Sequence, residues 1–385
     1  MQAQQLPFGM GVPQLAAALL LLVFLAQCLF LIYALPVTSL EMGYIADGLM
    51  QLENLSASAS PERSPLVPVL AALPLKLVAG RILYYQLDDY RFLIRLPFLF
   101  CGVMLGASVW YVARRLHGNL GGFIALALYS FSPIVVYRTS QVQEDIVAAW
   151  GAFGVIFTGI AVAHTLYAPR EVILWNWRRI LLLGISIALC VGSQFPLWIV
   201  LLPALAFLLW VGHVRRGAAL IIFGTACAVA ALLLLAFYGF QPIVFAHAMS
   251  DAQWFVFVPG QLASRLSYKL VGLFLLQAGL GPMVLIVGGL ATFAVWKRTR
   301  FFGTAAPLIM AVVLVTAALV TDSFSAPLFL FVAFPFLILF VSGVAVDLLE
   351  SQYAVVANAV VVGALIANAM LDVYGLIELR HLGVR

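Results

Sequence analysis

Long apolar segments recur from one end of this 385-residue sequence to the other, and they restrict its fold more than any other feature. A helix needs about 20 mainly apolar residues to cross the roughly 30 Å hydrocarbon core of a membrane. About eleven segments meet this requirement, at residues 14–36, 91–113, 119–137, 146–167, 180–194, 196–213, 217–238, 268–296, 303–321, 327–346 and 353–373. The sequence therefore predicts an all-α fold, a polytopic bundle of transmembrane helices.

The composition supports a membrane location and excludes one obvious class of partner. Charged residues make up 9% of the chain, against about 25% in an average soluble domain. The formal net charge is +5, but the Lys and Arg residues lie in short clusters between apolar segments, where membrane topology accounts for them. We therefore expect no nucleic-acid partner. The four cysteines lie inside apolar segments and are expected to be free packing residues.

The basic clusters assign a side to each loop. They fall at every second loop, at Arg114/Arg115, Arg170/Arg178/Arg179, Arg215/Arg216 and Lys297/Arg298/Arg300. The positive-inside rule makes that side cytoplasmic. Nearly all acidic residues then lie on the other side, so the expected location is a bacterial inner membrane with the polar site facing the periplasm or the cell exterior.

One membrane domain, residues 1–385, accounts for the whole chain, and the apolar segment at the N-terminus is expected to be retained as the first helix. The outer loops 37–90 and 239–267 are long and contain apolar stretches that are too short or too broken to span. Such stretches favour helices that lie in the membrane interface. We expect these two loops to roof a substrate cavity.

Three carboxylates that are far apart in sequence share the outer face. Glu41 and Asp47 follow the first helix, and Asp145 opens the fourth. A helical backbone would place Tyr44 on the same face as Glu41 and Asp47. These carboxylates suit a general base or the binding of a divalent cation. The alternatives are a solvated loop helix for the first pair and, for Asp145, a helix N-cap or first-turn acid.

Other polar pairs on the outer face also have two interpretations. His247 and Asp251 have the i, i+4 spacing of a metal site, but also of a surface pair. Arg265 and Lys269 have the same spacing and would either hold a lipid phosphate or extend to the interface from a helix end. Arg91 and Arg95 follow Asp88 and Asp89, with which they would pair unless they face the same cavity.

Several motifs in the first two hundred residues are similar to those of one enzyme class. These are "LEMGYIADGLM" after the first helix, "RSPLVPVLAALPLKL", the "RLP" that begins with Arg95, "ARRLHG", and "SPIVVYRTSQVQEDI", which places Asp145 twelve residues after Pro133. In this order they resemble the GT-C membrane glycosyltransferases, in particular the bacterial branch that is similar to dolichyl-phosphate-mannose-protein mannosyltransferases. The chain departs from that pattern in having one carboxylate in the first motif, Ser193 and Gln194 in place of a lysine, and no Arg and Tyr in the late helix.

The resemblance implies a glycosyltransferase that moves a hexose or pentose from a polyprenyl-phosphate donor to an acceptor at the outer face. Catalytic candidates are Glu41, Asp47 and Asp145; substrate-binding candidates are Tyr44, Arg95, Arg138, Glu144, Gln194, Arg265 and Lys269; candidate ligands for a divalent cation are Asp145, Glu41 and His247. The expected partners are the lipid-linked sugar donor and membrane lipid. The alternative function is a non-catalytic GT-C-like protein or a transporter of lipid-linked glycans, favoured by the single carboxylate of the first motif.

Overall fold

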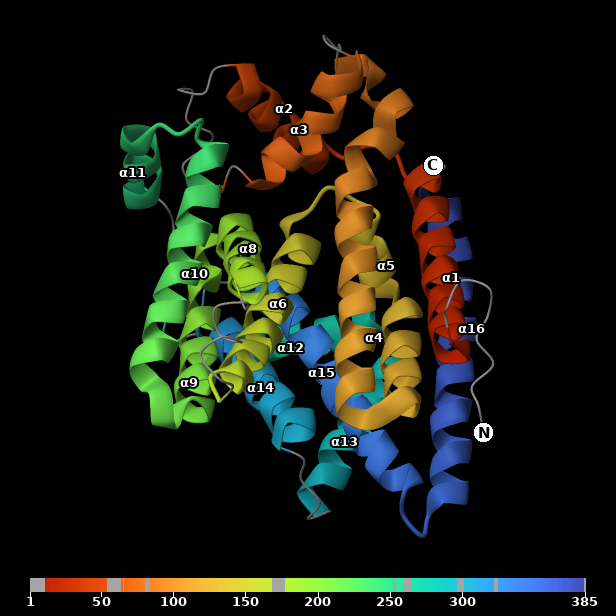
Figure 1. Cartoon of the computed structure of the whole chain (residues 1–385). Coiled ribbons are helices and arrows are strands. Elements are labelled where there is room, and N and C mark those ends of the chain that lie inside the picture. The colour runs from red at the N-terminus through yellow and green to blue at the C-terminus, as the bar shows by residue number, and fades with distance from the viewer. Residues whose placement is uncertain are drawn as a thin grey trace.

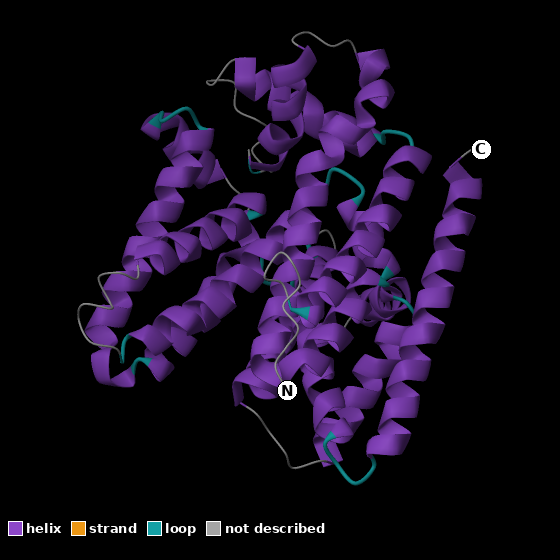
Figure 2. Ribbon diagram, turned by 45° about the vertical axis from the view of Figure 1, so that its right-hand side comes forward, coloured by secondary structure: helices purple, strands orange, loops and turns teal. Residues whose placement is uncertain are grey.

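The computed structural model describes residues 11–53, 64, 66–79, 84–167, 177–251, 254–258, 260, 265–295, 301–321 and 325–383 (Figure 1). Within these residues the secondary structure is helical, with no strand (Figure 2). Seven of the described helices are long and apolar enough to cross a membrane: α1 (Val12–Ala34), α4 (Arg91–Ser130), α6 (Glu144–Thr165), α10 (Arg216–Phe237), α14 (Ala306–Val320, after a π-helical turn at Phe301–Ala305), α15 (Ala326–Leu349) and α16 (Ala354–Gly383). The predicted polytopic bundle is confirmed.

Shorter helices complete the bundle. These are α5 (Pro133–Thr139), α8 (Trp177–Ser193), α9 (Leu201–Val211, after the 3-10 turn η2 at Phe195–Val200), η3 (His213–Arg215), α12 (Arg265–Ala278) and α13 (Leu280–Val295). One end of the bundle carries α2 (Ser39–Glu53), α3 (Leu66–Ala79), η1 (Tyr84–Tyr90) and α11 (Pro242–Asp251) (Figure 1). We call this the outer end. It corresponds to the two long loops of the sequence, 37–90 and 239–267.

The predicted helices 91–113 and 119–137 are the two legs of α4. The reversal lies at Gly118, whose φ of 79° is a left-handed conformation that glycine adopts without a steric penalty. The second leg ends earlier than predicted, at Ser130. Pro133 has no N–H with which to continue the helical hydrogen bonds, so a new short helix, α5, begins there.

Two predicted helices near the C-terminus differ from the structure. The segment 268–296 is two helices, α12 and α13, separated by Gly279 with a φ of 102°. The last helix does not stop at residue 373 but continues to Gly383. Asp372, which the sequence places at a helix end, therefore lies inside α16.

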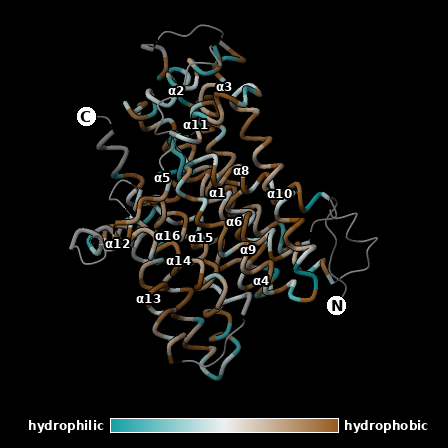
Figure 3. Tube along the Cα trace, turned by 90° about the vertical axis from the view of Figure 1, so that its left-hand side faces the viewer, coloured by the Kyte–Doolittle hydropathy of each residue, from teal (hydrophilic) through white to brown (hydrophobic). Residues whose placement is uncertain are grey.

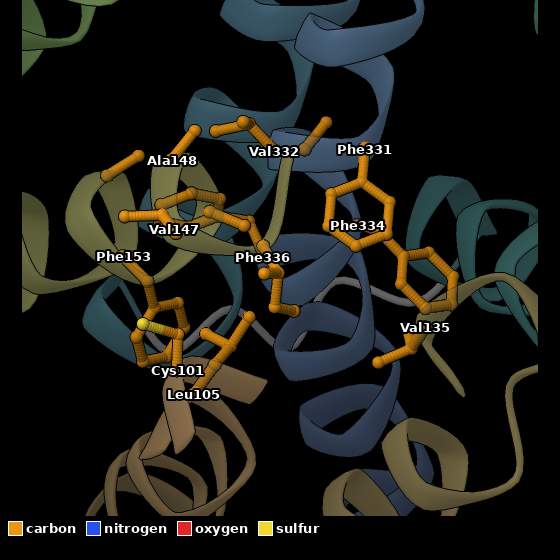
Figure 4. Packing of buried hydrophobic residues seen from close by; sticks show 14 of the residues in the cluster. Cys101, Leu105, Val135, Val147, Ala148, Phe153, Phe331, Val332, Phe334 and Phe336 are labelled. Atoms are coloured by element: carbon orange, nitrogen blue, oxygen red, sulfur yellow. The ribbon is translucent and has the colours of Figure 1, made fainter. Parts of the chain in front are cut away.

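The centre of the bundle is α15, whose residues from Ala326 to Asp347 are buried apart from the half-buried Pro327. Its phenylalanines pack against α4, α5 and α6, as Phe336 does toward Phe153 (Figure 4). The helices α1, α10 and α16 are the least buried of the seven candidate spans and are apolar, as expected of helices that face lipid (Figure 3). The bundle therefore has a tightly packed centre at α15 and a lipid-facing rim.

Candidate active site

The first part of the site is the start of α2. The backbone N–H of Thr38 donates to Glu41 Oε2 at 2.8 Å, and the N–H of Glu41 donates to Thr38 Oγ1 at 3.3 Å. This reciprocal pair is a capping box, which satisfies two N–H groups that the first turn of a helix leaves without partners. It fixes the Glu41 carboxylate at the N-terminus of α2.

Glu41 forms a fully buried ion pair with Arg95 of α4. Arg95 Nε and Nη2 each lie 2.8 Å from one oxygen of the carboxylate, and neither side chain is exposed. The other guanidinium N–H groups donate to the backbone oxygens of Ile32 (3.0 Å), Leu35 (2.9 Å) and Pro36 (2.9 Å) at the end of α1. All five N–H groups of the guanidinium thus have an acceptor. The expectation that Arg95 pairs with Asp88 or Asp89 is wrong, since its partner comes from α2.

Glu41 also holds the segment between α5 and α6. The backbone N–H of Val142 donates to Glu41 Oε1 at 2.9 Å. Together with the bonds from Arg95, from the backbone of Thr38 and from its hydroxyl at 3.2 Å, the carboxylate accepts five hydrogen bonds. Such a carboxylate is saturated, because two oxygens offer about four lone-pair sites. Glu41 therefore joins the start of α2 to α4 and to the α5–α6 segment, and through Arg95 it is connected to the end of α1.

A second ion pair lies at the N-terminus of α6. Arg138 Nη1 lies 2.6 Å from Asp145 Oδ2, and the same nitrogen donates to Gln143 Oε1. Gln143 Nε2 in turn donates to Gln141 Oε1 at 2.8 Å. Gln143 is the N-cap residue of α6, so Asp145 is a first-turn acid and not the cap. Asp145 is buried and Arg138 is partly exposed, which gives the pair one accessible side.

Glu144 brings two further elements to the same place. The hydroxyl of Tyr44 on α2 donates to Glu144 Oε2, and Gln194 Nε2, between α8 and η2, donates to Glu144 Oε1 at 2.6 Å. Tyr44 and Glu144 are 100 residues apart in sequence. We call Glu41, Tyr44, Arg95, Arg138, Glu144, Asp145 and Gln194 the outer polar cluster. The predicted approach of Glu41 and Asp145 at one end of the molecule is therefore present in the structure.

The remaining predicted residues lie at different places. Asp47 is half-buried on α2, one helical step beyond Tyr44. His247 is exposed on α11, and Lys269 is exposed on α12. The side chains of Asp251 and Arg265 lie outside the described residues. Among the residues that the structure describes, no group of three or more His, Cys, Asp or Glu side chains is arranged to hold a metal ion.

Two neighbouring residues reinforce the end of α1 rather than the cluster. Arg91 donates to the backbone oxygens of Asp88 at 2.8 Å and of Tyr33 at 2.9 Å. The carboxylate of Asp88 accepts from the N–H of Val37 at 2.9 Å. Thr38 is not among the residues predicted from the motifs, although the spacing "TSLE" is the Thr-x-x-Glu signature of a capping box.

Comparison with known proteins supports the resemblance drawn from the motifs. Residues 65–240, just under half of the chain, match the family described as dolichyl-phosphate-mannose-protein mannosyltransferase. The structure is similar to ArnT from Cupriavidus metallidurans in the apo state, with a TM-score of 0.61 and 12% identity over 95% of this chain and 75% of that one. The chain has the GT-C fold.

Further solved GT-C structures are similar over much of this chain. ArnT bound to undecaprenyl phosphate has a TM-score of 0.57 and 12% identity over 85% of this chain. The oligosaccharyltransferase AglB from Archaeoglobus fulgidus, in complex with an inhibitory peptide and a dolichol-phosphate, has a TM-score of 0.53 and 14% identity over 93% of this chain. The chain spans 59% of the lipid-bound ArnT and 55% of AglB. No curated protein sequence matches it.

Proposed function

We propose that this protein transfers a sugar from a polyprenyl-phosphate donor to a hydroxyl acceptor at the outer end of its helix bundle. The observation that carries the proposal is the outer polar cluster, in which two ion pairs and a Tyr–Glu–Gln group converge from α2, α4, α5, α6 and the α8–η2 turn. The GT-C fold supports it, and two solved relatives of that fold hold undecaprenyl phosphate and dolichol-phosphate. A lipid-linked donor needs no nucleotide-binding loop.

The division of roles follows from the hydrogen bonds. Glu41 accepts five, so we assign it a positioning role rather than that of a base. Asp145 keeps one oxygen for an acceptor hydroxyl, because Arg138 contacts the other. The acceptor oxygen would attack the anomeric carbon as its proton moves to Asp145. The bond from that carbon to the phosphate oxygen breaks, its electron pair leaves with the lipid phosphate, and the anomeric configuration inverts.

The other candidate residues are proposed to bind the substrates and take no part in proton transfer. Arg138 stabilises negative charge on the departing phosphate, an electrostatic contribution that is often large in enzymes. Tyr44 and Gln194 orient Glu144, which offers its half-buried carboxylate to sugar hydroxyls. Lys269 and Arg265 are proposed to contact the lipid phosphate, and Asp47 is proposed to contact the acceptor or a divalent cation. The helices α2, α3 and α11 of the two long outer loops are proposed to roof the site, which would face the periplasm or cell exterior of a bacterial inner membrane.

A single substitution tests the scheme. Purified protein in proteoliposomes is given undecaprenyl phosphate that carries a radiolabelled hexose or pentose, together with a lipid and glycan extract of bacterial membranes that supplies hydroxyl acceptors. Transfer of the label to an acceptor and release of undecaprenyl phosphate are followed by chromatography. Asp145→Asn should lower the rate by at least a hundredfold, the usual range for loss of a general base, with unchanged thermal stability. Asp89→Asn is the matched control, since Asp89 is exposed on η1 at the same end. Equal rates for Asp145→Asn and the wild type would reject Asp145 as the base.

One observation favours the alternative function, transport of a lipid-linked glycan without transfer. Transporters have ionisable residues and broken helices at membrane depth, and here Asp372 is buried inside α16 while α4–α5 and α12–α13 are interrupted. The same proteoliposomes separate the two functions. Movement of the labelled lipid between leaflets, with no bond cleavage in any donor, would identify a transporter.

A further inference from the structure

Two interrupted helices meet within the bundle, away from the outer polar cluster. α4 ends at Ser130 before α5 begins at Pro133, and α12 ends at Ala278 before Gly279. Each interruption leaves backbone carbonyls without their helical partners. In a membrane these groups must be satisfied by protein, because no water is at hand. The structure shows which side chains satisfy them.

Three of the freed carbonyls accept a hydrogen bond from a side chain of another segment. Ser132 Oγ donates to Ala278 O at 3.0 Å, and Asn368 Nδ2 of α16 donates to Phe131 O at 2.7 Å. With its amide oriented so that the nitrogen faces acceptors, Gln27 of α1 donates to Ser130 O at 3.0 Å and to Asp372 Oδ2 at 3.2 Å. The backbone of the α4–α5 break is thus held from both α1 and α16.

Asp372 is the most unusual member of this group. It is fully buried on α16, four residues after Asn368 and therefore on the same face, and its Oδ1 has no hydrogen-bond partner among the described residues. A carboxyl group at membrane depth is costly and usually marks a function. Asn368 and Asp372 are the two polar residues among the buried side chains of α16, which otherwise are Ala357, Val361 and Leu376.

The break leads directly to the candidate active site. α5 is seven residues long and carries Arg138 near its C-terminus. This C-terminal end of α5 also contacts α1, since Ser140 Oγ, which donates to Val136 O at 2.7 Å, lies 3.2 Å from Cys28 O. A displacement of the α4–α5 break would therefore move Arg138 relative to Asp145.

We propose that Asn368 and Asp372, together with Gln27, form a polar latch by which α16 sets the position of α5 and of the Arg138–Asp145 ion pair. The latch residues touch neither the donor nor the acceptor. They act as positioning residues, and their consequence for sugar transfer rests on the function proposed above. The position of α5 itself is measurable without any substrate.

The test is hydrogen exchange of residues 133–143, measured by mass spectrometry on the full chain in nanodiscs of phosphatidylethanolamine and phosphatidylglycerol. Asn368→Leu, of similar size, should speed exchange there by about threefold to tenfold, the effect of one lost buried hydrogen bond. Asn358→Leu is the matched control, because Asn358 is exposed on the same helix. Gln27→Met removes the latch from the α1 side and should also speed exchange of residues 133–143. It provides the test if Asn368→Leu does not fold.

Asp372 provides a test of rescue. Asp372→Leu should speed exchange in the same peptides, whereas Asp372→Asn, which still accepts from Gln27, should resemble the wild type. Unchanged exchange in Asn368→Leu, Gln27→Met and Asp372→Leu, or an equal change in Asn358→Leu, would overturn the latch. In the transfer assay the latch variants should lower kcat and leave the KM for the donor unchanged. Altered exchange with no transfer by the wild type would support the latch and reject the proposed function.

Discussion

Glu41 at the outer end and Asp372 in the interior of the bundle are both carboxylates with no exposed surface, but they differ in the number and charge of their hydrogen-bond partners. Glu41 faces a guanidinium whose every N–H has an acceptor, and it receives five hydrogen bonds. Asp372 faces one neutral amide, and one of its oxygens has no partner among the described residues. Partners, rather than burial, therefore decide what a buried carboxylate contributes. At the outer end it joins four segments; in the interior it is one member of a weaker polar group.

The difference predicts that the largest loss of stability follows from removal of Arg95. Arg95→Met would leave Glu41 as an uncompensated buried charge and would free three carbonyls at the end of α1. Breaking a buried ion pair from one side costs about 3–5 kcal/mol. Thermal unfolding in detergent should therefore shift strongly downward. Arg91→Met is the control, since the bonds of Arg91 to backbone oxygens are exposed and should contribute far less.

A double variant then separates the contribution of the Glu41–Arg95 charge pair to stability from that of the other hydrogen bonds of these two residues. Glu41→Leu combined with Arg95→Met removes both charges, so it should be more stable than Arg95→Met alone. A double variant no more stable than the single one would show that the capping of α1, Thr38 and Val142, and not the charge pair, dominates the energy of this region.

Glu41→Gln is the next largest effect and tests the positioning role of that carboxylate. A glutamine presents an NH2 group to donors, either Arg95 or the N–H of Thr38 and Val142, so at least one buried donor loses its acceptor. The change also leaves the buried Arg95 guanidinium without its counter-charge, so the expected cost is about 3–5 kcal/mol in the free energy of unfolding, larger than for Asp145→Asn. Arg95→Met should cost more still, because it also frees the three carbonyls at the end of α1. Full stability of Glu41→Gln combined with complete loss of transfer would instead assign Glu41 to catalysis.

The sequence predicts some of these features and not others, for physical reasons. Apolar segments of spanning length reveal the bundle, because membrane thickness sets a helix length. The common end of Glu41 and Asp145 follows from the positions of the basic clusters. The pairing of Glu41 with Arg95, 54 residues away, depends on how α2 folds back over α1 and α4, which no local pattern encodes. Hydropathy predicts one helix over residues 268–296, because a single glycine, Gly279, does not interrupt the apolar pattern although it interrupts the helix.

The length of α16 could not be predicted from the sequence either. Hydropathy falls after residue 373, but a helix continues for as long as its backbone hydrogen bonds form, and α16 reaches Gly383. The role of Asp372 is visible only once this helix is seen to pass beside Gln27. A buried site that arises from helix contacts between distant segments therefore requires the structure.

The smallest effect on stability is expected when Asp372, like Glu41 above, is replaced by its amide. Asp372→Asn keeps the size of the side chain and an oxygen that accepts from Gln27, and no cation within ion-pair distance of Asp372 is found among the described side chains. The free energy of unfolding should change by less than about 0.5 kcal/mol, as for a substitution that breaks none of the major interactions. Parallel thermal unfolding of Asp372→Asn and Glu41→Gln measures the contrast directly. Equal losses in the two variants would mean that Asp372 has a strong charged partner, and that the two carboxylates stabilise the bundle in the same way.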